Sequence, residues 1–295
     1  MSENCWIVYN GSLSQKKFIS YAEWMAAAAS QAGIRAELVP NNEILTVFQS
    51  GRCTLTGQKS GSLPDFVLFG DKDVLLARQL ERMNVPVFNS SSSIEVCDSK
   101  TLMYEQLALQ GIPFPKTMSS PKLFTPDHNE RHIEMYMHEF TFPMIVKEAY
   151  GSFGQQVYLV HSKNELQEKI RELDGVEYVV QEFISESNGR DIRINVIGGE
   201  PVASMIRRSV SDFRANITSG GTAENYSPTA EEKALAVAAA RAVGTDFAGV
   251  DLLFTKEGPT VCEVNSNAHI ESIFHCTGIN VADYMLSYIK EIVYG

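Results

Sequence analysis

Two apolar segments near the C-terminal end carry polar residues at alternating positions, and this pattern constrains the fold more than any other feature. The segments are residues 249–254 and 260–264. Side chains alternate between the two faces of a strand, so Glu263 and Asn265 share one face. The intervening residues 255–259 have the length and composition of a hairpin turn, which predicts that Asp251 lies opposite them.

Two carboxylates and an amide oxygen on one sheet face form a hard, all-oxygen set of ligands. Such a set suits Mg²⁺, with Mn²⁺ as an alternative, when phosphates and water fill the remaining positions. We therefore predict Asp251, Glu263 and Asn265 as metal ligands. The alternative is an amphipathic hairpin with a solvated polar face. Polar residues inside apolar strands are costly without a partner, which favours the metal site.

A lysine and two glycines near the middle of the chain indicate a turn that binds phosphate. Lys147 ends a predicted strand, and Gly151 and Gly154 lie in the turn that follows. Closely spaced glycines let backbone N–H groups approach phosphate oxygens, and the lysine adds a positive charge. The motif is not a Walker P-loop, because no Gly-Lys-Ser/Thr follows. A glycine-containing hairpin beside a surface lysine is the alternative.

Arginines are concentrated between these two motifs, although the chain has a net charge of −11. They are Arg190, Arg193, Arg207, Arg208 and Arg214. Arginines at strand ends are usually solvated or paired with carboxylates. Their concentration here predicts a clamp for anionic ligands. The acidic total argues against nucleic acid as a partner, because phosphate backbones require concentrated Lys and Arg.

The order of predicted elements indicates an α/β (α+β) chain of two or three domains, since 295 residues exceed one ordinary core. In the first ninety residues we expect strands at 6–9, 36–39, 65–69 and 85–88, and helices at 16–32 and 71–83. This alternation predicts a small parallel sheet with covering helices. No G-x-G-x-x-G motif accompanies it.

The rest of the chain is predicted to be richer in strands. We expect strands at 143–149, 155–160, 177–183, 191–197 and 201–207, and helices at 99–110, 163–173, 231–243 and from 281 onward. Thr229 with Glu232 three positions later predicts a capping box. The polar run 89–93 is the expected first boundary, which gives domains 1–92, 93–184 and 185–295.

The five cysteines are irregularly spaced and form neither a disulfide framework nor a C-x-x-C pair. This usage fits a reducing, cytoplasmic environment. The N-terminus is not a basic leader, and no apolar run approaches the roughly 20 residues of a membrane span. We expect neither export nor a membrane partner.

The order of the motifs resembles the ATP-grasp superfamily, and most closely its RimK-like branch, which attaches glutamate or similar amino acids to carrier proteins, peptides or cofactors. The motifs are Asp98-x-Lys100, Lys147, Gly151-Ser152-x-Gly154, Gln181-Glu182-Phe183, Asp191-x-Arg193, Phe213-Arg214-Ala215-Asn216, Gly249-Val250-Asp251 and Glu263-Val264-Asn265. The resemblance covers roughly residues 86–290. It implies an ATP-grasp fold preceded by a Rossmann-like pre-ATP-grasp domain.

The resemblance also implies roles for individual residues. Lys100 and Lys147 would hold the phosphates of ATP, and Gly151, Ser152 and Gly154 would form a lid over them. Glu182 and Phe183 would line the adenine slot, with Asp191 on the ribose side and Arg214 and Asn216 at the terminal phosphates. Magnesium would be held by Asp251, Glu263 and Asn265. Arg193 and Arg207 would steady the acyl phosphate and the tetrahedral adduct.

The implied activity is ATP-dependent joining of a carboxylate to an amine through an acyl phosphate. Attack of a carboxylate on the γ-phosphate brings two anions together, so metal, lysines and arginines must neutralise the charge. We expect an amino acid and a peptide, carrier protein or cofactor as substrates, with glutamate preferred over neutral amino acids. Residues 266–269 depart from the Pro-Gly turn that often follows in the family. A homo-oligomer is left open.

Other patterns in the sequence are compatible with alternative sites and functions. His128 and His132 have helical zinc spacing but lack the H-E-x-x-H order. His275 and Cys276 invite a catalytic dyad, yet adjacent residues point apart. Cys262 alternates away from the acidic face and is predicted to be a core residue. A nucleotide-binding regulatory protein without turnover, a D-alanine-type ligase and a carboxylase are the alternative functions. Three metal ligands favour an enzyme, and Phe213-Arg214-Ala215-Asn216 disfavours the last two.

Overall fold

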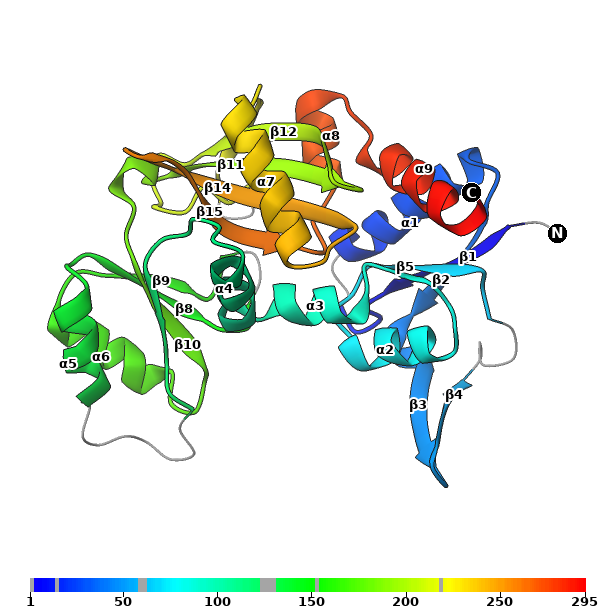
Figure 1. The fold of residues 1–295 in the computed structure, drawn as a ribbon, viewed down its shortest axis with the longest axis horizontal. Helices are drawn as coiled ribbons and strands as arrows, with labels where there is room; N and C mark the ends of the chain where they lie inside the picture. Colours follow the sequence, from blue (N-terminus) through cyan, green and yellow to red (C-terminus); the bar gives the residue numbers. More distant parts are fainter. Residues whose placement is uncertain (1–2, 14–15, 58–62, 123–130, 152–153, 218–219) are drawn as a thin grey trace.

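The computed structural model describes residues 3–13, 16–57, 63–122, 131–151, 154–217 and 220–295. These residues form three larger sheets and one two-stranded hairpin. Figure 1 shows the N-terminal sheet at one end of the molecule, the second sheet at the other end, and the third sheet with its helices above and between them.

The N-terminal sheet is parallel, as the sequence predicts, with the strand order β2-β1-β5-β6. Its strands are β1 (Asn4–Tyr9), β2 (Arg35–Pro40), β5 (Phe66–Phe69) and β6 (Val87–Phe88). Alternation along β1 divides its side chains between two cores. Cys5 and Ile7 pack with helix α1 (Lys16–Gln31), while Trp6 and Val8 pack with helix α2 (Val74–Arg82). Both faces of the sheet are therefore covered by helices.

A hairpin that the sequence analysis did not predict projects from this region (Figure 1). It consists of β3 (Ile44–Gln49) and β4 (Arg52–Gly57). Ser50 and Gly51 connect the strands with φ values of 52° and 73°. Positive φ at both central residues is typical of the two-residue turns that match the twist of a hairpin. The Ser-Gly pair between Thr- and Val-containing segments was the signal for it.

The second sheet is antiparallel with the order β7-β10-β8-β9. Its strands are β7 (Thr117–Ser119), β10 (Tyr178–Glu182), β8 (Met144–Glu148) and β9 (Val157–Val160). Helices α5 (Arg131–Glu139) and α6 (Lys163–Glu172) cover one face and share a core with it. The other face is directed toward the third sheet (Figure 1).

The third sheet is antiparallel with the order β13-β12-β11-β14-β15. Its strands are β13 (Thr222–Asn225), β12 (Glu200–Arg208), β11 (Arg190–Ile197), β14 (Phe247–Thr255) and β15 (Gly258–Asn265). Helices α4 (Lys100–Leu109) and α7 (Ala230–Ala242) pack on one face. The capping box of α7 is confirmed, because the Thr229 side chain accepts from Glu232 N and the Glu232 side chain accepts from Thr229 N.

The C-terminal helices return to the N-terminal sheet. Helices α8 (Glu271–Thr277) and α9 (Val281–Tyr294) follow β15, and both contribute to the core that contains α1 and β1. That core also includes residues of β11, β12 and β14. The N-terminal and third sheets therefore share one hydrophobic core.

The polar run 89–93 is not a loop between these parts. Ser91–Asp98 forms helix α3, which the sequence analysis did not predict, and the Ser90 side chain caps it. Asn89 is buried, with 2% of its surface exposed. Its Oδ1 accepts hydrogen bonds from Asp246 N and Phe247 N, and its Nδ2 donates to Phe247 O and Ser266 O. One polar side chain thus joins the N-terminal sheet to the third sheet.

We expect Asn89→Ala to lower the free energy of unfolding by about 2–4 kcal/mol, because it leaves several buried backbone groups without partners. Urea unfolding followed by circular dichroism measures the change. Asn164 is exposed on α6 and provides a matched control. Asn164→Ala should stay within about 0.5 kcal/mol of the wild type. Equal effects of the two substitutions would contradict this role for Asn89.

Candidate functional site

A cavity of about 880 Å³, including the space at its open mouth, lies between the second and third sheets. Most of the predicted site residues line it: Lys100, Lys147, Gly151, Gly154, Glu182, Phe183, Asp191, Arg207, Arg214, Asn216, Asp251 and Glu263. Arg193 and Asn265 are not in the lining. Ser152 lies outside the described residues. Segments far apart in sequence therefore meet at one place.

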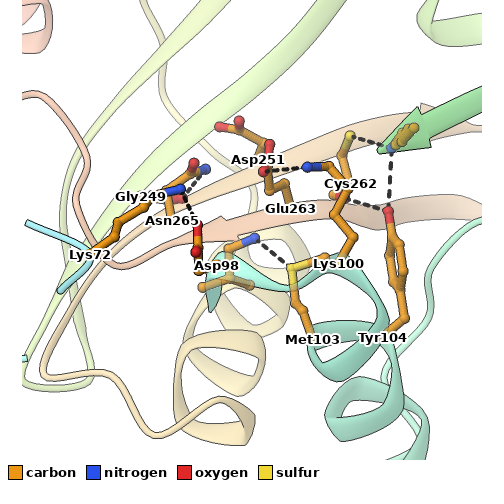
Figure 2. Close-up of polar contacts among 12 residues, drawn as sticks. Lys72, Asp98, Lys100, Met103, Tyr104, Gly249, Asp251, Cys262, Glu263 and Asn265 are labelled. Atoms are coloured by element: carbon orange, nitrogen blue, oxygen red, sulfur yellow. Dashed lines mark hydrogen bonds and ion pairs between the residues drawn. The ribbon is translucent and has the colours of Figure 1, made fainter. Parts of the chain in front are cut away.

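Two buried lysines stand at the inner end of the cavity. Lys147 comes from β8, and its Nζ donates to Tyr104 Oη at 3.3 Å and lies 3.9 Å from Cys262 Sγ. Lys100 is the first residue of α4, and its Nζ is 3.9 Å from Glu263 Oε1. Figure 2 shows Lys100 directed toward Glu263, with Tyr104 and Cys262 close by. Burial lowers the pKa of Lys100, and the nearby Glu263 only partly offsets it.

These lysines are loosely held by protein partners. A charge-assisted hydrogen bond is normally about 2.7–2.9 Å long, whereas the Lys100–Glu263 pair is at 3.9 Å. Lys147 has a phenol and a thiol as its close polar neighbours in the described structure, without a carboxylate in contact. A buried ammonium group without a close anion is costly, so both lysines are suited to receive an anionic ligand.

The central arginines form a different arrangement, a buried ion-pair network across three strands. Arg207 on β12 donates to both oxygens of Asp191 on β11, at 2.6 and 2.7 Å. Arg193 on β11 donates to both oxygens of Asp251 on β14, at 2.7 and 2.6 Å. Arg207 Nη2 also lies 3.0 Å from Asp251 Oδ2. These four residues are called the arginine–aspartate network below.

The network corrects the prediction of an anion clamp formed by unpaired arginines. Asp191↔Arg207 and Arg193↔Asp251 are direct ladder partners, so strand register brings opposite charges together. Burial favours the neutral acid, yet Arg193 and Arg207 outweigh it and hold the pKa of Asp251 below its ordinary value. Arg214 is likewise paired, with Asp212. The cations at these positions are already neutralised within the protein.

Arg214 also connects the second and third sheets. Its Nη1 donates to the backbone oxygen of Gly154 at 2.6 Å. Gly154 has a φ of 70°, and a Cβ there would lie 2.9 Å from Asn216 Oδ1. Glycine is therefore required both by the backbone conformation and by the close approach. The predicted lid turn touches the 213–216 motif over the cavity, as far as its residues are described.

Part of the cavity lining is apolar. Ile145, Val157, Phe183, Ile184 and Leu253 contribute to it from the second and third sheets. Glu182 also lines the cavity, but its carboxylate accepts a hydrogen bond from Lys116 N at 2.6 Å. Apolar side chains together with two lysines in one cavity offer surfaces for an aromatic base and for phosphates.

The predicted metal ligands lie at adjacent positions of β14 and β15. Asp251 and Glu263 are ladder partners, and Gly249 pairs with Asn265. Asn265 Nδ2 donates to Gly249 O at 3.2 Å. The described part of the chain contains no group of three or more His, Cys, Asp or Glu residues arranged to hold a metal ion. The Asp251 carboxylate forms ion pairs with two arginines. The Glu263 side chain is 31% exposed, and its ion pair with Lys100 is long, at 3.9 Å.

Some residues of the site were missed or misjudged. Cys262 lines the cavity and was predicted to be a core residue. Gln181 also lines it and donates to Thr117 Oγ1 at 2.7 Å. Tyr104 contacts Lys147 and donates to Cys262 O at 2.8 Å. No spacing pattern singles out Tyr104, because it lies on a helix that is far from β15 in sequence.

The described histidines of the alternative sites lie away from the cavity. His132 is on α5, where its ring packs against Tyr136, and His128 lies outside the described residues. His275 is on α8, 3.7 Å from Glu271, and it stacks edge-on with Trp24. Neither of the described histidines lines the cavity.

Comparison with known proteins agrees with this geometry. A family model for the RimK-like ATP-grasp domain matches residues 97–289. A probable alpha-L-glutamate ligase of Methanococcoides burtonii is 38% identical over 217 residues, covering 72% of this chain and 70% of that protein. The uncharacterized MG012 homolog of Mycoplasma pneumoniae is 32% identical over 246 residues, covering 79% of this chain and 84% of that protein.

The solved structures show the same fold. D-alanine–D-alanine ligase from Bacillus anthracis, complexed with ATP, superposes with a TM-score of 0.74 at 20% identity, covering 99% of this chain and 97% of that one. The fold and the cavity define an ATP-grasp ligase, a class of enzymes that form C–N bonds and use ATP. Within that class, the chain belongs to the RimK-like branch. In the described part of the chain, no helix has the length and apolar character to cross a membrane.

The two ladder partners should differ in their contribution to stability. Asp251→Asn removes the charge between two buried guanidinium groups and should lower the free energy of unfolding by about 3 kcal/mol. Glu263→Gln loses one long, partly exposed ion pair and should change it by less than about 1 kcal/mol. Urea unfolding of both variants tests the difference. Equal losses would show that the network does not hold the sheet.

Proposed function

We propose that this enzyme activates a carboxylate with ATP as an acyl phosphate and joins it to the amino group of an amino acid such as glutamate. The carboxylate would belong to a peptide, a carrier protein or a cofactor. The single observation that carries the proposal is the cavity itself. Its lining combines Lys100 and Lys147 beside Glu263 with apolar side chains from the two sheets.

In this proposal the lysines receive the phosphates of ATP. Both are buried and loosely paired, so an incoming phosphate restores a close anionic partner. The apolar residues around Phe183 enclose the base. Gly151 and Gly154 cover the phosphates, and the Arg214–Gly154 contact ties that cover to the third sheet. Exclusion of water protects a reactive acyl phosphate from hydrolysis.

A divalent cation fits the donors that remain available. Glu263 and Asn265 follow each other on one face of β15, and the Glu263 carboxylate faces the cavity. Carboxylate and amide oxygens, completed by phosphates and water, suit Mg²⁺, with Mn²⁺ as an alternative. Asp251 would join them if Arg193 shifts toward a substrate anion. Bound metal would neutralise the charge between the carboxylate and the γ-phosphate.

The substrate class rests on the relatives rather than on the arginines. Several related proteins are named probable alpha-L-glutamate ligases. Arg193, Arg207 and Arg214 are paired with aspartates, so they do not by themselves indicate a second substrate carboxylate. The likeness to D-alanine–D-alanine ligase, at 20% identity, concerns the fold alone.

Glu263→Gln should lower kcat at least about tenfold and raise the magnesium concentration needed for half-maximal rate, because it removes one charged ligand. ADP release in a screen of amino acids and carrier peptides, with mass spectrometry of the products, measures the activity. Glu257 lies in the turn of the same hairpin and is exposed. Glu257→Gln should retain the wild-type rate. Wild-type turnover of Glu263→Gln at limiting magnesium would refute the metal role.

Among amine substrates, glutamate should have a kcat/KM at least about tenfold above that of neutral amino acids, which corresponds to roughly 1.4 kcal/mol. This expectation rests on the related proteins named probable alpha-L-glutamate ligases. A site that binds the side-chain carboxylate of glutamate loses that interaction when an amide replaces it. Glutamine is therefore the matched comparison, because it has the same size and lacks the charge. A higher kcat/KM for neutral or basic amino acids would exclude this substrate class but not the ligase chemistry.

A further inference from the structure

Asp71 is a buried carboxylate for which the nucleotide site gives no role. It follows the C-terminal end of β5 and is 7% exposed. Its Oδ1 accepts a hydrogen bond from Asn10 Nδ2 at 3.1 Å. Its Oδ2 is buried and has no hydrogen-bond partner in the described structure. A buried acceptor without a donor costs free energy, so a missing donor is the simplest explanation for this side chain.

The position of Asp71 is one at which ligands bind. In a parallel sheet covered by helices, ligands lie beyond the carboxyl ends of the strands. Strands β1 and β5 are adjacent and parallel. Asn10 directly follows β1, and Asp71 lies just beyond the end of β5. Burial also raises the pKa of Asp71, and the hydrogen bond from Asn10 and the backbone and charge of Lys72 only partly counteract this effect. A cationic donor would favour the charged form of such a carboxylate.

The next residue links Asp71 to the ligase site. Lys72 forms an ion pair with Asp98, which ends helix α3 two positions before Lys100. Figure 2 shows Lys72 beside Asp98 and Asn265, on the side of the site away from Tyr104. The N-terminal sheet therefore reaches the end of the site at which the polar residues of β15 lie.

A second connection leads to the loop at residues 266–269. A Cβ on Gly70 would lie 3.0 Å from Tyr21 Cε1, so Tyr21 packs against the end of β5. The Tyr21 ring contacts the His269 ring edge-on, with centroids 6.0 Å apart. The sequence neighbours of Asp71 therefore contact both Asp98 and, through Tyr21, the loop that departs from the family pattern.

We propose that Asp71 recognises the ammonium group of the amino acid substrate through its Oδ2. The inference rests on the proposed function, since it assigns the amine that the ligase uses. An ammonium group supplies both the missing donor and a compensating charge, and Asn10 fixes the carboxylate by holding Oδ1. A metal ion fits less well, because the neighbouring carboxylate of Asp73 caps α2 and accepts from Asn41.

Calorimetric titration in the presence of a non-hydrolysable ATP analogue tests the inference without turnover. The probes are amino acids and their deaminated counterparts, for example glutamate and glutarate. The wild type should bind the amino acid more tightly. Asp71→Asn should weaken binding of the amino acid about tenfold to a hundredfold and leave its counterpart unchanged. Asp73→Asn keeps a helix-capping side chain and removes a nearby charge. It should change neither the affinity for the amino acid nor the affinity for its deaminated counterpart.

Hydroxylamine separates this inference from the ligase proposal. It is uncharged near neutral pH and traps an acyl phosphate as a hydroxamate without needing an ammonium site. Asp71→Asn should form hydroxamate at the wild-type rate while its KM for the amino acid rises. Absence of hydroxamate from the wild type would count against the acyl-phosphate proposal. The binding titration would still test whether Asp71 binds the ammonium group.

Two results would overturn the role of Asp71. One is a wild-type protein that binds no amino acid more tightly than its deaminated counterpart. The other is unchanged amino acid binding in a folded Asp71→Asn variant. If that variant does not fold, Asn10→Ala frees Oδ1 and should weaken amino acid binding several-fold. Unchanged binding in Asn10→Ala would then overturn the inference, because the carboxylate would no longer be held in place.

Discussion

The arrangement of the site depends on the buried arginine–aspartate network of the third sheet. Arg207 bridges Asp191 and Asp251, and Arg193 completes the charge balance. Removing one member of such a network leaves an uncompensated buried charge, which is strongly destabilising. Because the four residues come from β11, β12 and β14, the network fixes these strands at the floor of the cavity. Lys100 and Lys147 stand outside this network, and neither has a carboxylate of the described residues at hydrogen-bond distance.

The hydrophobic cores determine which parts of the enzyme are joined firmly. The N-terminal and third sheets share one core, to which α1, α8 and α9 contribute. Asn89 adds four hydrogen bonds across the same junction. The second sheet has a core of its own with α5 and α6. Asp71 and β15 therefore belong to one unit, while the turn that contains Gly151 and Gly154 lies on the other side of the cavity.

Local patterns in the sequence were sufficient for most strands and for the long helices. The predicted range 249–254 lies within β14, and the capping box located the start of α7 within one residue. The ion-pair partner of each charged residue was harder to predict, because strand register determines which side chains meet. Asp191 and Arg207 are sixteen residues apart and meet only through the β11–β12 ladder. The domain boundaries and residue roles stay predictions.

Two features of the structure that composition does not reveal share one physical cause. The polar run 89–93 predicts a domain boundary, and Asn89, Ser91 and Ser93 within that run are buried. The concentration of arginines predicts an anion clamp, and the carboxylate partners of Arg193 and Arg207 come from neighbouring strands. A polar side chain can be satisfied by solvent or by a ligand. Burial with full hydrogen bonding is the other way to satisfy such a group, and composition alone does not distinguish them.

Strand position explains why ladder partners Asp251 and Glu263 have different environments. β14 lies between β11 and β15, so Asp251 is enclosed and receives arginines from the neighbouring strands. β15 is at the edge of the sheet, so Glu263 meets α4 and the open cavity instead. The same chemical group therefore stabilises the sheet at the inner position and remains available to a ligand at the edge. A hairpin that pairs an inner strand with an edge strand can combine both tasks.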